Sequence, residues 1–151
     1  MKKIALFCFF VFLMGDNISY TNATPTLHPR YEDKGSLAHI TFFNMQDILN
    51  PPYLVKHGEY LKVEMGFTSP CDIASLIMET YVVINGIRVP CGPKTDMGLY
   101  LTLPIRQGDS RRFLIQLPMT IPMRGEMELL INIQDQQRRD IINIAALIEV
   151  L

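Results

Sequence analysis

Two cysteines are the residues whose spacing most directly suggests chemistry in this sequence. Cys71 and Cys91 are the cysteines that follow an N-terminal leader, and in an oxidising compartment two cysteines usually pair. Closing a loop of this length would stabilise the fold by about 3 kcal/mol in the chain-entropy model. Neither cysteine has a second cysteine or a histidine at the spacing of metal ligands. The sequence predicts a Cys71–Cys91 disulfide, with two buried free thiols as the alternative, and no metal site.

Residues that could act as acids, bases or nucleophiles do not converge. His28, His39 and His57 are scattered along the chain, and each is expected at the surface. Glu126 and Glu128 lie two residues apart on one face of a predicted strand, where solvated charge is the usual role. The sequence has no nucleophile elbow, no zinc-protease histidine pair and no phosphate-binding glycine loop. These observations predict a protein that is not an enzyme and needs no cofactor.

The N-terminus predicts a secretory signal. Lys2 and Lys3 precede an apolar run from Ile4 to Met14, which is shorter than the ~20 residues of a membrane span. We expect residues 1–23 to be removed and the product to be secreted, or delivered to an endosomal or lysosomal lumen.

The cleavage site affects possible glycosylation. Cleavage after Ala23 fits the small residues there, whereas a cut near Gly15 is the alternative. Only the earlier cut would retain the glycosylation sequons at Asn17 and Asn22.

Residues 24–151 suit a single domain with its own core. Removing Lys2, Lys3 and Asp16 from the 14 basic and 15 acidic residues of the full chain leaves a net charge of −2. This charge gives no attraction to nucleic acid.

Short strands should build this domain. Seven apolar, alternating or β-branched runs indicate strands at residues 37–45, 60–67, 77–84, 99–103, 112–117, 126–134 and 141–150. With no convincing helical period, this pattern predicts an all-β, immunoglobulin-like antiparallel sandwich of two sheets and about seven strands. A closed barrel is the alternative, but it requires eight or more strands in steady succession.

The dipeptide Asn85-Gly86 predicts a tight hairpin. It favours a two-residue type I′ turn, after which residues 87–89 run back along the strand at 77–84. The return would bring Cys91 to the level of Cys71, which makes the predicted disulfide geometrically plausible.

Methionines are unusually frequent in or beside the predicted strands. Met65, Met78, Met119, Met123 and Met127 all occupy such positions. Because methionine adapts to irregular neighbours, these residues could line a cavity for a flexible apolar ligand or simply fill the core. Composition leaves both possibilities open.

From Tyr53 to Leu151, the order of signals resembles the MD-2-related lipid-recognition family. The matching pieces are Lys56–Gly58, Val63–Ser69, Asn85–Cys91, Leu103–Ile105 with Gly108, Leu117–Pro118, Ile131–Asp135 and Ile144–Val150. The resemblance implies a sandwich whose sheets splay to hold a sterol or acyl-chain lipid. It thus predicts a lipid-binding or lipid-transfer protein whose partner is a sterol, fatty acid or phospholipid. The alternative is a secreted protein-interaction module or receptor co-factor with a filled core.

The resemblance and the strand alternation nominate ligand-contacting residues. The family likeness places the loop Val89–Cys91 and the strand containing Phe113 at the pocket mouth, and Phe113 is the leading candidate for ligand contact. Strand alternation adds the wall residues Met65, Phe67, Tyr81, Val83, Ile115, Leu129, Ile131 and Ile144. Plain core packing is the alternative role for each of them.

The sequence also departs from the family pattern. Family members commonly carry three disulfides, but here no cysteine falls between the leader and Cys71 or after Cys91, and Ile142 and Asn143 occupy the place of a last-strand cysteine. The resemblance therefore indicates a divergent member, to which a particular ligand or protein partner is not carried over.

Two arginine pairs suggest a way to meet a membrane. Arg111-Arg112 and Arg138-Arg139 fall at predicted turns and could contact anionic lipids transiently, although such pairs are commonly just solvated.

Overall fold

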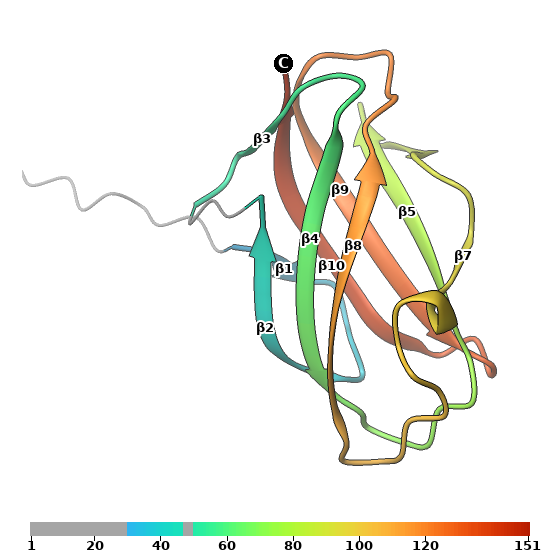
Figure 1. Ribbon diagram of the computed structural model, residues 1–151. Coiled ribbons are helices and arrows are strands. Elements are labelled where there is room, and N and C mark those ends of the chain that lie inside the picture. Colours follow the sequence, from blue (N-terminus) through green and yellow to red (C-terminus); the bar gives the residue numbers. More distant parts are fainter. Residues whose placement is uncertain (1–29, 47–49) are drawn as a thin grey trace, which may run out of the picture.

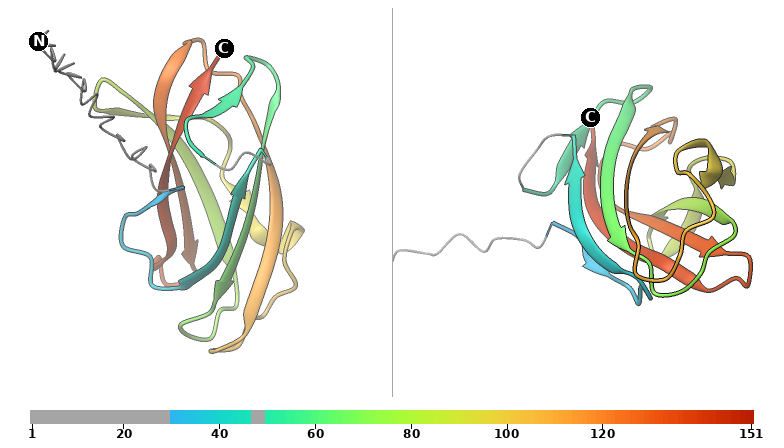
Figure 2. Two further views of the ribbon diagram at one scale, coloured as in Figure 1. Left: turned by 90° about the vertical axis from the view of Figure 1, so that its left-hand side faces the viewer. Right: turned by 60° about the horizontal axis from the view of Figure 1, so that its bottom comes forward.

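A computed structural model describes residues 30–46 and 50–151 of the chain (Figure 1). The predicted leader, its two sequons and His28 lie outside these described residues. Two sheets face each other and form a sandwich, as the turned views of Figure 2 make plain. The predicted all-β, two-sheet fold is confirmed.

The larger sheet has the central strand order β1-β10-β9-β5-β6. Its strands are β1 (Glu32–Asp33), β10 (Asp140–Val150), β9 (Gly125–Asp135), β5 (Leu76–Ile84) and β6 (Ile87–Pro90), with β3 (Tyr53–Val55) beside β10 and β7 (Thr95–Asp96) beside β5. The smaller sheet contains β2 (His39–Met45), β4 (Tyr60–Thr68) and β8 (Ser110–Pro118). Within the described residues every strand pair is antiparallel except β3 with β10.

Most predicted strands are observed, and the hairpin turn has the expected backbone. Asn85 and Gly86 have φ values of 51° and 80°, the two positive angles that a type I′ turn needs. By contrast, the predicted strand at residues 99–103 is wrong. The short 3-10 helix η1 (Met97–Leu99) and a turn occupy this region, because the Asp96 carboxylate accepts the Gly98 N–H and starts the helix.

The core lies between the two sheets. Alternate residues of each long strand point inward, and on β4 these are Leu61, Val63, Met65 and Phe67, all 0% exposed. Their counterparts on β9 are Met127, Leu129, Ile131 and Ile133, which belong to the same continuous apolar cluster. Each such side chain stabilises the fold by about 1.5–3 kcal/mol when fully buried.

Different structures close the two long sides of the sandwich. On the β2 side, the rings of Tyr31 and Phe43 lie 4.9 Å apart, and Tyr53 packs edge-on at 6.3 Å from Phe43. On the β8 side, the segment from residue 91 to residue 109, which contains β7 and η1, passes beside β5 before β8 begins (Figure 1; Figure 2, right). We call residues 91–109 the covering segment. It buries Met97 and Ile105, and Ile105 forms a two-residue bridge with Ile73.

Gly66 allows the smaller sheet to assemble. The pairing of β2 with β4 shifts between Ile40 and Phe42, and this irregularity brings Thr41 and Phe42 against Gly66. A Cβ on Gly66 would lie 2.9 Å from Thr41 Oγ1 and 3.1 Å from Phe42 Cβ. A side chain at position 66 would therefore push the two strands apart.

We expect Gly66→Ala to lower the free energy of unfolding by about 1–3 kcal/mol through overpacking, as measured by urea denaturation. Gly92→Ala is the matched control, because its Cβ would meet only Thr80 Oγ1 at an ordinary 3.5 Å. The control should change stability by less than about 0.5 kcal/mol. Equal stabilities of the two variants would contradict this account of Gly66.

Candidate functional site

The inter-sheet space brings together most of the residues predicted to form a ligand pocket. Seven of them face inward and are no more than 3% exposed: Met65, Phe67, Phe113, Ile115, Leu129, Ile131 and Ile144. The rings of Phe67 and Phe113 pack edge-on with centroids 6.3 Å apart. These side chains belong to one continuous core cluster, so the space between the sheets is closed. Whether they contact a ligand stays a prediction.

Three predicted residues lie elsewhere. Tyr81 and Val83 point to the outer face of the larger sheet, where Tyr81 pairs with Leu130 and Val83 with Glu128. The inward residues of β5 are instead Thr80 and Val82. The prediction for Tyr81 and Val83 is wrong because residues 77–84 are apolar on both faces, so alternation alone did not fix which face turns inward.

Val89 is also less enclosed than predicted. It pairs with the inward Val82 but is 36% exposed, because β6 is a short strand at the edge of the larger sheet. A pocket wall at Val89 is therefore not observed.

The predicted mouth corresponds to the β8 side of the sandwich. Phe113 lies on β8, an edge strand of the smaller sheet, and Cys91 follows β6, an edge strand of the larger sheet. The covering segment connects these two places along the chain. Its buried residues Met97, Leu101 and Ile105 were not among the predicted site residues, since the irregular backbone of this segment gives no periodic signal.

The polar residue Thr80 lies among the apolar side chains of the interior. Thr80 is 4% exposed, and its side chain hydrogen-bonds to the thiol of Cys91, which is 6% exposed. Burial raises the pKa of the Cys91 thiol, although the contact with Thr80 opposes part of that rise. Cys91 is therefore an inert, neutral thiol at physiological pH.

The predicted Cys71–Cys91 disulfide is absent, and both cysteines are free. The two-residue turn pairs Ile84 with Ile87, and this register places Cys91 opposite Thr80, where its N–H donates to the Thr80 carbonyl. Cys71 precedes Leu76, the first residue of β5, which is itself about 13 Å from Thr80 along the strand. A disulfide needs Cα atoms within about 7 Å of each other.

Cys71 contacts an ion pair instead. Its Sγ lies 3.1 Å from Nη2 of Arg139, and that guanidinium binds the fully buried carboxylate of Asp135 at 2.6 Å. The Asp135 carboxylate also accepts the backbone N–H groups of Gln137 and Arg139, each at 2.9 Å. Burial alone would raise the pKa of Asp135, but these hydrogen bonds together hold it below the usual value. The group ties the β9–β10 turn to the start of β5.

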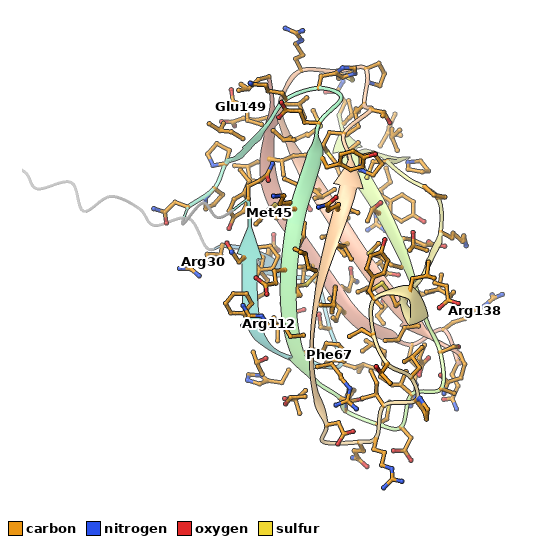
Figure 3. The ribbon with its side chains drawn as sticks, in the orientation of Figure 1. Arg30, Met45, Phe67, Arg112, Arg138 and Glu149 are labelled. Carbon is orange, nitrogen blue, oxygen red and sulfur yellow. The ribbon has the colours of Figure 1, made fainter. Side chains whose placement is uncertain are left out.

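The predicted membrane-contacting arginines are largely engaged within the protein. Arg112, labelled in Figure 3, bonds to Glu64 at 2.6 Å and lies over the Phe42 ring on the outer side of the smaller sheet. Arg111 pairs with Asp109. Arg139 is held by Asp135. Arg138, at the tip of the β9–β10 turn, extends into solvent, so membrane contact stays a prediction that rests on this residue (Figure 3).

The described histidines lie at the surface, away from the inter-sheet space. His39 and His57 are exposed and lie at opposite ends of the β2–β4 pair, since His39 pairs with Thr68 at the end of β4 and His57 precedes its first residue, Tyr60. Across residues 30–46 and 50–151, no three histidine, cysteine, aspartate or glutamate side chains gather to hold a metal ion. Nor does any helix in these ranges have the length and hydropathy of a transmembrane span.

The geometry defines an immunoglobulin-like sandwich of two antiparallel sheets, and comparison with solved structures agrees on this fold. A Niemann-Pick type C2 protein from Japanese carpenter ant matches with a TM-score of 0.69 at 13% identity, over 80% of this chain and 98% of that one. Chicken MD-1 complexed with lipid IVa matches with a TM-score of 0.56 at 12% identity, over 80% and 88% of the two chains. The C-terminal domain of wzt matches with a TM-score of 0.58 at 17% identity, over 82% of both chains.

These similarities confirm the predicted resemblance at the level of the fold. Neither a scan against family models nor a search of curated proteins finds a match. The sequence identities to these solved structures are low, between 12% and 17%.

We expect N-ethylmaleimide to label Cys71 in the native protein and Cys91 only after unfolding, because Cys71 is partly exposed whereas Cys91 is buried and its thiol pKa is raised. Mass spectrometry of labelled peptides measures both sites. Failure to label either cysteine without a reductant would instead indicate the disulfide.

A second prediction concerns acid stability. Because the pKa of Asp135 is depressed in the folded state, its stabilisation is complete above about pH 4 and is lost as the pH falls through the folded pKa. Asp135→Asn should lower the unfolding free energy by about 2 kcal/mol at neutral pH, less than for a fully buried pair because Arg139 is partly exposed.

Urea titrations at neutral and strongly acidic pH test this expectation, since the difference between wild type and Asp135→Asn should shrink in acid. Glu126→Gln, an exposed change on the same strand, is the control. A difference that does not vary with pH would show that the Asp135 charge is not the cause.

Proposed function

We propose that the protein binds a lipid, either a sterol or an acyl-chain lipid, between its two sheets and carries it in a secreted or lumenal setting. The observation that carries this proposal is an inter-sheet surface that is almost wholly apolar and is bordered on the β8 side by the covering segment. The setting follows from the predicted leader, which is the expectation for residues 1–23. The protein is proposed to act without catalysis.

The inner surface suits a flexible guest. Five buried methionines from different elements contribute to it: Met45, Met65, Met78, Met97 and Met127. Unbranched thioether side chains change rotamer readily, so they can make room for a ligand and fill the same space again when the ligand is absent. Each ligand methylene that leaves water gains about 0.8 kcal/mol, from which the core contacts that it displaces must be subtracted, and this gain supports affinity without charged contacts.

The covering segment suggests the route of entry. Among the described contacts, it is attached by the two residue pairs of β7 with β5, by the bridge of Ile105 to Ile73 and by buried side chains such as Met97 and Leu101. Moving it aside would expose the side chains beside Phe113 and would break only these short pairings, while the long strand ladders of both sheets stay intact. Entry on this side agrees with the mouth that the family resemblance implies.

Structural neighbours add support. MD-1 was solved in complex with lipid IVa, and the Niemann-Pick type C2 protein has the highest TM-score of the three neighbours described above. A shared sandwich makes the inter-sheet space the natural place for a lipid in this chain as well. Similarity to these structures at low sequence identity supports only a shared fold. We therefore infer the class of ligand, an apolar lipid, from the apolar side chains of the interior.

A second candidate is a protein-interaction module. The closed interior favours it, since the inward side chains already contact one another and shallow hollows lie on the outer faces of both sheets. In that case function would depend on the exposed loops and faces.

Binding of a fluorescent sterol and a fluorescent fatty acid distinguishes these candidates. We expect saturable binding of at least one probe, and we expect Phe113→Ala to weaken that binding by about tenfold through the loss of ring contacts. Leu114→Ala is the matched control, because Leu114 is adjacent but 52% exposed.

Phe113→Ala also removes core packing worth about 3 kcal/mol, so circular dichroism must establish that the variant is folded. The milder change Phe113→Leu, which removes the ring but keeps a large apolar side chain, provides a second variant if it is not. Absence of saturable binding by the wild-type protein would reject lipid carriage and favour the interaction module.

A further inference from the structure

The outer face of the larger sheet contains a polar groove that the lipid proposal does not use. Two adjoining hollows of about 330 and 370 Å³ share Arg88, Leu130 and Asn143. They lie across β6, β5, β9 and β10, on the face of the sheet opposite to the core. We call this feature the outer groove. Leu130 forms part of its floor and is only 6% exposed although it points away from the core, so this face is hollowed.

Amide side chains are held in fixed positions in the outer groove. Asp140 Oδ1 accepts hydrogen bonds from Nδ2 of Asn132 at 3.0 Å and from Nε2 of Gln134 at 2.7 Å. The second oxygen of Asp140 accepts from Asn143 Nδ2 at 3.5 Å. Each of the first two amides thus uses one N–H and keeps a carbonyl oxygen and a second N–H. The groove therefore presents donors and acceptors side by side on a rigid sheet.

Charge in the outer groove is nearly balanced. Glu79 accepts from the Tyr81 hydroxyl and pairs with Lys94, whereas Glu128 lies 3.5 Å from the ammonium of Lys34. The remaining cationic side chain of the groove is that of Arg88, whose guanidinium makes no hydrogen bond or ion pair among the described residues. The carboxylate of Asp140 offsets this single charge. A polyanion would meet three carboxylates here, so the groove is unsuited to nucleic acid or other highly charged ligands.

We infer that the outer groove binds a saccharide that is neutral or carries one acidic group. Sugar hydroxyls need a donor and an acceptor at close spacing, which the amides of Asn132 and Gln134 supply. The apolar C–H face of a sugar ring matches the floor at Leu130 and the neighbouring ring of Tyr81. Arg88 adds planar donors suited to ring hydroxyls or to one carboxylate.

This inference is independent of lipid binding. The groove and the core occupy opposite faces of the same strands, with Tyr81 outward and Thr80 inward. A protein without any lipid would keep the outer groove, and a lipid carrier with a blocked groove would still bind lipid.

Calorimetric titration with lactose, maltotetraose, N,N′-diacetylchitobiose and 3′-sialyllactose tests the inference. We expect the full secreted protein to bind at least one of these probes at millimolar or lower concentration. Arg88→Ala should weaken that binding by at least about tenfold, since it removes charge-assisted hydrogen bonds. Arg106→Ala is the matched control, because Arg106 is also an exposed arginine but lies in the covering segment.

Amide chemical shifts locate the bound sugar. Shifts at Tyr81, Arg88 and Asn132 on addition of the probe, with the control variant behaving as wild type, would support the outer groove. No binding of any of the four probes, binding unaffected by Arg88→Ala, or shifts confined to other surfaces would each overturn the inference.

Discussion

Burial of one apolar face of each sheet against the other is the interaction on which the rest of the structure depends. The side chains of β4 and β9 that alternate inward supply much of it, and every other element completes this contact or borders it. Aromatic rings close the β2 side, and the covering segment closes the β8 side. Because of this constraint, the two faces of the larger sheet differ in composition. The inner face is apolar, whereas the outer face carries carboxylates, amides and an arginine.

The closed state of the core gives the proposed function a physical requirement. A guest between the sheets must displace side-chain contacts that already exist, so its affinity would be the difference between two apolar packings. Methionines reduce the penalty because they repack without strain. Displacement of the covering segment breaks only the short β5–β7 pairing and the bridge of Ile105 to Ile73 and leaves the long strand ladders in place. Its attachment should therefore influence how fast a lipid enters and leaves.

The sequence predicted the sandwich and most of its strands because their alternation of apolar and polar residues is strong, as in β4 and β9. Seven of the predicted pocket residues do face the space between the sheets. The prediction failed for Tyr81 because β5 has apolar residues on both faces, so the pattern does not show which face turns inward. It also failed at residues 99–103, where the Asp96 side chain caps the 3-10 helix η1 and no strand forms. The disulfide prediction overlooked the register of the hairpin: the two-residue turn pairs Ile84 with Ile87, which places Cys91 opposite Thr80 and not near Cys71. The outer groove gave no motif because its residues come from four strands.

The central claim is that the space between the sheets receives a lipid. Mass spectrometry of the protein, secreted from cells and examined under native and then denaturing conditions, tests this most directly. We predict a native mass that exceeds the polypeptide mass by that of one sterol or acyl-chain lipid, with the excess lost on denaturation and the lipid recovered in the organic extract. A native mass equal to that of the polypeptide, unchanged after incubation with sterol or fatty acid, would contradict the account.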